Sequence, residues 1–118
     1  MLGLMMDTPL LISSLMNHAE KNFPEQEIIS VASDDPNHRY TFKDAFKRTR
    51  QLANGLQKLG IQHGDRLGTL AWNDHRHFEL YYAVSCSGFI CHTVNPRLFP
   101  EQLVYIINHA EDRVIFCD

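Results

Sequence analysis

Two histidines with one residue between them, His75 and His77, are the first candidates for chemistry in this sequence, because imidazole nitrogens bind zinc. They open a segment with helical spacing, where side chains two positions apart point to different faces. No cysteine or third ligand nearby has a spacing suited to zinc. The pattern therefore favours structural roles for both histidines over a metal site.

Arg97 is the second candidate, because it follows an apolar segment, residues 89–95, that reads as a parallel strand. Open α/β sheets bind ligands beyond the carboxyl ends of such strands. Arg97 in this position could bind an anion. The alternative is that Asn95 and Pro96 build a turn and Arg97 is a surface cation or caps a carbonyl, and the residue types favour this alternative.

Known catalytic motifs are missing from the sequence. Gly55 and Gly60 have the spacing of a phosphate-binding loop, but Ile61 and Gln62 follow in place of Lys and Ser/Thr. Neither a GxGxxG nor a GxSxG motif occurs, and no two carboxylates suggest an acid–base pair. We therefore assign no catalytic, cofactor-binding or metal-binding residue, and expect Asp34 and Asp35 to be solvated surface.

The composition is that of an ordinary globular domain. The 118 residues are 44% apolar and 21% charged, with a net charge of −3, which gives no reason to expect nucleic acid as a partner. No apolar run is long enough to span a bilayer, and the N-terminus lacks the basic region of a secretory signal. The three cysteines, Cys86, Cys91 and Cys117, read as buried reduced thiols, which favours the cytoplasm.

The first sixty residues are expected to form a helix, a hairpin and a second helix. The first helix runs from Pro9 to about Asn22, with Thr8 as its cap. Two extended segments, EIISVAS and HRYT, flank a cluster of turn-forming residues. Thr41 and Asp44 then resemble a capping box. The helix that they open ends at Gly60, and its apolar stripe is Ala45, Phe46, Leu52, Ala53, Leu56 and Leu59.

In residues 61–118 the pattern changes, and short apolar strands are expected to alternate with helices. We expect strands at 67–72, 89–95 and 113–118 and helices at 74–87 and 101–110. Glu111, Asp112 and Arg113 read as a turn with a local ion pair. This βαβαβ order predicts an α/β fold whose small parallel sheet has helices on both faces. The last strand lacks a further neighbour, so the domain looks incomplete.

The order of these segments resembles the N-terminal region of the AMP-forming acyl-CoA synthetases, which are adenylate-forming enzymes. The matching pieces are a helix ending LQKLG, the turn GDR, the helix segment ELYYAV, the turn NPRLFP and the segment YIINHAED. The resemblance extends from about Leu10 to Asp118. The matching segments are most similar to those of the medium- and long-chain fatty-acyl and methylthiopropionate ligases. It implies a partial N-terminal subdomain over residues 1–118, with helix, hairpin and helix in 1–60 and the βαβαβ unit in 61–118.

The resemblance also implies the reaction of the full-length enzyme. A fatty acid carboxylate attacks the α-phosphate of Mg²⁺-bound ATP to give acyl-AMP and pyrophosphate, and the thiol of CoA then displaces AMP. The family's phosphate-binding loop and its other catalytic motifs are missing from this sequence. We therefore expect this fragment to be inactive alone and to bind neither ATP, Mg²⁺ nor CoA. The alternative is a self-contained α/β module that binds a partner or forms a dimer without catalysis.

The apolar N-terminal segment, residues 1–16, has two interpretations that remain open. In the fatty-acyl branch this part of the chain contributes to dimer contacts, so the resemblance suggests a homodimer. Leu11, Leu15 and Met16 could equally cover the chain's own core, because an apolar stripe suits either form of burial.

Overall fold

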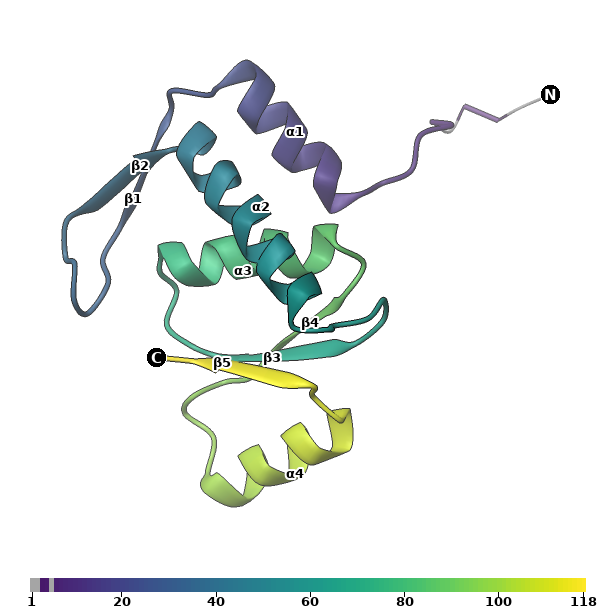
Figure 1. Ribbon diagram of the computed structural model, residues 1–118, viewed down its shortest axis with the longest axis vertical. Coiled ribbons are helices and arrows are strands. Elements are labelled where there is room, and N and C mark those ends of the chain that lie inside the picture. The colour runs from purple at the N-terminus through teal and green to yellow at the C-terminus, as the bar shows by residue number, and fades with distance from the viewer. Residues whose placement is uncertain (1–2, 5) are drawn as a thin grey trace.

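The computed structural model describes residues 3–4 and 6–118 of the chain. These residues form four helices and five strands in an α/β arrangement (Figure 1). In chain order the elements are α1 (Ile12–Asn22), β1 (Glu27–Ser30), β2 (His38–Thr41), α2 (Phe42–Lys58), β3 (Arg66–Leu70), α3 (His75–Cys86), β4 (Ile90–Thr93), α4 (Pro100–Ala110) and β5 (Val114–Cys117).

The predicted hairpin and capping box are both confirmed. Strands β1 and β2 pair antiparallel, with Glu27 opposite Thr41 and Ser30 opposite His38. The Thr41 hydroxyl accepts the Asp44 backbone N–H at 3.2 Å, and the Asp44 carboxylate accepts the Thr41 backbone N–H at 3.4 Å. Two backbone donors at the start of α2 are satisfied in this way.

The parallel sheet has the strand order β4-β3-β5, so β3 is central and is hydrogen-bonded on both sides. Helix α3 crosses one face of the sheet and α4 crosses the other (Figure 1). The predicted βαβαβ unit with helices on both faces is thus confirmed. Within the described part of the chain, β4 and β5 each leave one edge without a partner strand.

The hydrophobic core lies on the α3 side of the sheet. It contains Leu67 of β3, Leu80 and Val84 of α3, and Leu56 of α2. Burying a side chain of this size stabilises a fold by about 1.5–3 kcal/mol, because apolar surface leaves water. The opposite face is less well covered, since α4 contains no fully buried residue.

Two local predictions in the first half of the chain are wrong. Helix α1 begins at Ile12, after Leu11 donates its backbone N–H to the Pro9 carbonyl in a turn, so Thr8 does not cap it. Leu59 is 70% exposed and lies outside the apolar stripe of α2, because it follows the last helical residue.

The predicted local ion pair at residues 111–113 is also wrong. The side chain of Asp112 is fully buried and accepts from His92 Nδ1 of β4 at 2.8 Å. Glu111 pairs instead with Arg66 of β3 at 2.9 Å. The turn therefore ties α4 and β5 to strands distant in sequence, because β3 and β4 lie beside it in the sheet.

Gly68 of β3 makes room for the buried Asp112 carboxylate. A Cβ atom at Gly68 would lie 3.1 Å from Asp112 Oδ2 and 3.2 Å from Asp112 Cγ. The carboxylate cannot retreat without lengthening its contact with His92. Glycine at the middle of the central strand is thus a packing requirement.

No helix among the residues described in Figure 1 is both long and apolar enough to cross a bilayer.

Replacing Thr41 with alanine should lower the free energy of unfolding by about 1 kcal/mol, because the capping hydroxyl is lost. Thr8→Ala is the matched control, and its effect should stay within about 0.5 kcal/mol. Urea denaturation followed by far-UV circular dichroism measures both values. Equal losses in the two variants would contradict the capping assignment.

Gly68→Ala should destabilise the protein by about 1–3 kcal/mol, because the added methyl group overpacks the Asp112 carboxylate. Gly55→Ala should stabilise it by up to about 1 kcal/mol, because glycine disfavours helix interiors. A Cβ at Gly55 meets no atom within 4 Å. Thermal unfolding compares the two variants, and an unchanged midpoint for Gly68→Ala would show that the strand tolerates a side chain.

Candidate functional site

A crevice lies at the carboxyl ends of β3 and β4. These neighbouring strands lead to helices on opposite faces of the sheet (Figure 1). Diverging connections of this kind leave the space in which open α/β sheets bind ligands. A cavity of about 380 Å³ lies there. We call it the sheet crevice, and it is lined by residues 71–73 and 93–97 together with His77 and Tyr81.

Arg97 lies at this crevice, in the turn that the sequence predicts. Its backbone N–H donates to Asn95 Oδ1 at 3.0 Å. Among the described residues, its guanidinium forms no ion pair, and no carboxylate lines the crevice. Asn73 and Asn95 add amide groups. The arrangement suits an anionic group, which would gain charge-assisted hydrogen bonds from the arginine.

His77 lies between the sheet crevice and the protein interior. Its Nε2 lies 2.9 Å from Thr69 Oγ1, and its ring stacks on Tyr81 with a centroid separation of 4.6 Å. Its backbone N–H donates to Asp74 Oδ1, the N-cap of α3. The contact with Thr69 of β3 ties the first turn of α3 to the sheet, in agreement with the structural role expected from the sequence.

His75 faces away from His77, toward the hairpin. Its backbone N–H donates to Ser30 Oγ at 2.8 Å, and its carbonyl accepts from the Tyr40 hydroxyl at 3.5 Å. The two histidines do not share a ligand position. No group of three or more His, Cys, Asp or Glu side chains in the described residues could hold a metal ion.

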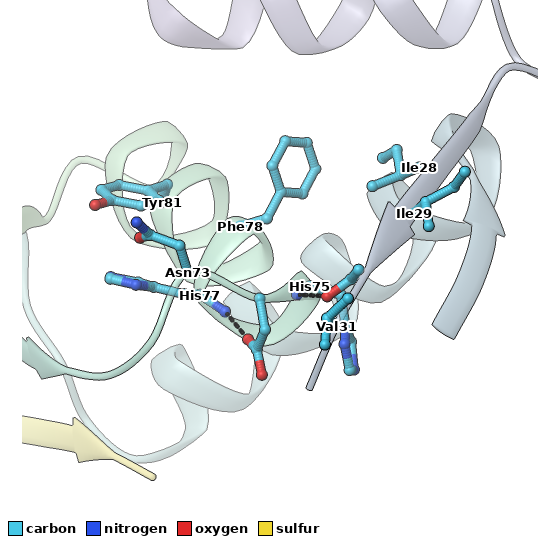
Figure 2. A pocket seen from close by; sticks show the side chains of 10 residues that line it. Ile28, Ile29, Val31, Asn73, His75, His77, Phe78 and Tyr81 are labelled. Carbon is cyan, nitrogen blue, oxygen red and sulfur yellow. Dashed lines mark hydrogen bonds between the residues drawn. The ribbon is translucent and has the colours of Figure 1, made fainter. Parts of the chain in front are cut away.

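A second cavity, of about 490 Å³, lies between β1 and α3. Figure 2 shows Ile28, Ile29 and Val31 on its hairpin side, with Phe78 and Tyr81 on its helix side. We call it the hairpin cavity. It shares Asn73, His77 and Tyr81 with the sheet crevice, so the two spaces adjoin at the N-terminus of α3.

Asp34 and Asp35 lie on the solvated surface, as the sequence suggested, with side chains 64% and 50% exposed, and each also contacts another side chain. Both carboxylate oxygens of Asp34 accept from Arg76 at 2.5 Å, and this pair lowers the pKa of Asp34. Asp35 Oδ2 lies 3.1 Å from His38 Nδ1. The hairpin loop is therefore anchored to α3 by charge, a contact that no local pattern could reveal.

A buried carboxylate, Glu79 of α3, lies behind the hairpin and pairs with Arg48 of α2 at 2.7 Å. The hydrogen bond to Glu79 raises the pKa of Arg48, and burial together with the nearby Glu79 raises the pKa of Tyr40. Both groups thus keep their protons, and neither is poised as a general base.

The three cysteines are free thiols, as expected, but they are not all buried. Cys86 and Cys91 are half-buried, and burial raises the pKa of both thiols. Cys117 is exposed, which contradicts the prediction, because it lies on the poorly covered edge strand β5. A raised pKa disfavours the thiolate, so neither Cys86 nor Cys91 is an activated nucleophile.

The N-terminal apolar stripe is largely uncovered. Leu11 is 57% and Leu15 is 62% exposed, whereas Met16 is buried against the fold. Residues 1, 2 and 5 of the predicted segment lie outside the described residues.

Comparisons with known proteins place this geometry in a family. The model of the AMP-binding enzyme family matches residues 16–118. The chain is 57% identical, over its whole length, to the 3-methylmercaptopropionyl-CoA ligase of Ruegeria lacuscaerulensis and covers 22% of that protein. It is 48% identical to the medium-chain-fatty-acid–CoA ligase of Ectopseudomonas oleovorans, again covering 22%. The chain thus spans about a fifth of the length of these curated relatives.

The fold recurs in a solved structure, the inhibitor-bound N-terminal domain of FACL13 from Mycobacterium tuberculosis. The TM-score is 0.78 at 21% sequence identity, and the match covers 91% of this chain and 26% of the other. The resemblance to acyl-CoA synthetases is confirmed by the family match and by the two CoA ligases. The chain belongs to the AMP-binding enzyme family.

Proposed function

We propose that this chain is the N-terminal part of an ATP-dependent, AMP-forming acyl-CoA ligase that acts on fatty acids or similar small carboxylic acids. The 57% identity to a CoA ligase along the whole chain is the observation that carries the proposal. A second CoA ligase at 48% identity supports the same class of acid substrate. A cytoplasmic location is part of the proposal and is supported by the three free thiols.

The proposed reaction has two steps. The acid's carboxylate attacks the α-phosphate of ATP, forming a mixed anhydride and releasing pyrophosphate. The thiol of CoA then attacks the acyl carbon, forming a thioester and releasing AMP. No step of the proposed reaction is assigned to a metal held by this chain, and Mg²⁺ would enter the site with the phosphates of ATP.

The contribution of this chain to that reaction is scaffold together with one anion-binding edge. Strand β3 and helix α3 hold the sheet crevice open, and Arg97 supplies its one formal positive charge among the described lining residues. ATP and CoA both carry phosphates, which an arginine without a carboxylate partner can bind. In this proposal, none of the residues that the structure describes makes or breaks a bond of the substrates.

A second candidate function, a non-catalytic module that associates through its apolar surface, is favoured by the exposed Leu11 and Leu15. The same surface would serve a homodimer of the ligase. The two functions differ in whether the intact gene product makes acyl-AMP.

The intact gene product should exchange labelled pyrophosphate into ATP when a fatty acid is present, whereas residues 1–118 alone should not. Arg97→Ala should raise the KM for ATP or CoA about tenfold, since one charge-assisted hydrogen bond is worth about that factor. Arg113→Ala is the matched control, because Arg113 is exposed in the bend just before β5 and does not line the crevice. Robust exchange by the short chain would contradict the scaffold assignment, and an unchanged KM in Arg97→Ala would exclude the anion-binding edge.

Leu11→Glu combined with Leu15→Glu should convert a dimer of the intact gene product into a monomer, because two charges would enter an apolar contact. Val104→Glu on the exposed face of α4 is the control and should leave the molar mass unchanged. Light scattering measures the mass. A dimer that survives the double substitution, or a monomeric unsubstituted protein, would exclude this surface as the dimer interface.

A further inference from the structure

Two imidazole rings join the hairpin to α3. The ring of His38, on β2, stacks on the ring of His75, with a centroid separation of 3.7 Å and an interplanar angle of 16°. The Tyr40 ring meets His38 edge-on at 4.8 Å and closes the stack on one side. Of these three residues, His75 lines the hairpin cavity, where it begins α3 and donates its backbone N–H to Ser30 (Figure 2).

Both rings of this stack have a buried nitrogen without a partner. His38 Nε2 and His75 Nδ1 are shielded from water and have no hydrogen-bond partner among the described residues. A proton added at either nitrogen would lack an acceptor, and buried charge without a partner is strongly disfavoured. The stacked geometry therefore suits two neutral rings.

The charged groups around the stack do not remove the cost of placing a proton on both rings. Asp35 accepts from His38 Nδ1 at 3.1 Å, so the buried Nε2 is the nitrogen of that ring that lacks an acceptor. A charge on His38 would lie across the stack from a proton on His75 and would disfavour it. The groups that surround the pair are Asp34 and Asp35 of the hairpin loop, Tyr40 of β2, Arg48 of α2, and Asp74, Arg76 and Glu79 at α3.

We propose that the His38–His75 stack is an acid-sensitive latch, which holds hairpin β1–β2 against α3 at neutral pH and releases it as the pH falls below about 6. Release frees β1, which forms one wall of the hairpin cavity. The latch therefore controls access to this cavity, and it is independent of the proposed ligase chemistry.

The sign of the pH dependence follows from proton binding. An imidazole released into water titrates near about 6.5. In the docked state burial lowers the pKa of His75, and charge on His38 lowers it further, while Asp74 and Glu79 oppose the shift. The docked state binds fewer protons than the released state. Docking is therefore complete above about pH 6.5 and weakens as the pH falls, by up to about tenfold per pH unit for one proton.

Amide hydrogen exchange on the intact gene product, at about pH 7.5 and about pH 5, tests the latch. Rates are corrected for the intrinsic pH dependence of exchange, and β3 amides serve as the internal reference. Protection of residues 27–41 should fall about tenfold relative to β3 at the lower pH. His75→Phe keeps an aromatic stack and removes the imidazole whose protonation burial disfavours, so the fall should disappear.

His109→Phe is the matched control, because His109 lies on an exposed part of α4 and stacks on Tyr105. This variant should lose hairpin protection at low pH just as the unsubstituted protein does. Equal hairpin protection at both pH values would overturn the proposal. So would an unchanged fall in His75→Phe, or a parallel loss in β3, which would indicate unfolding of the whole domain.

Discussion

The structure depends on the hydrogen bonding of β3 along both of its edges. This strand pairs with β4 on one side and β5 on the other, and its side chain Leu67 lies at the centre of the core. Because both pairings are parallel, each needs a crossover helix, and the order of strands places α3 and α4 on opposite faces. The sheet crevice is a direct result of that divergence.

The N-terminus of α3 joins the two cavities. Asp74 accepts the backbone N–H groups of Arg76 and His77, which fixes the first turn of the helix. Its neighbours then point in two directions, His77 toward the sheet crevice and His75 toward the hairpin. Movement of the hairpin would therefore shift the first turn of α3, which also lines the sheet crevice.

Local patterns in the sequence predicted the elements well and their long-range contacts poorly. The capping box at Thr41 and the order of strands and helices follow from neighbouring residues, so both were predictable. The Asp112–His92 contact and the His38–His75 stack join residues far apart in the chain, and no local spacing encodes them. The position of Arg97 was predictable from the sequence. Only the three-dimensional structure shows that no carboxylate lines the sheet crevice beside it.

Helix α4 covers its face of the sheet with only half-buried residues, namely Leu103, Ile106, Ile107 and Ala110. Its attachment relies on Arg66, which donates to the Ala110 carbonyl and pairs with Glu111. A helix with so little buried apolar surface opens at a lower free energy than the core. Strand β5 follows α4 and pairs only with β3 among the described strands, so α4 and β5 are the natural starting point for sub-global unfolding.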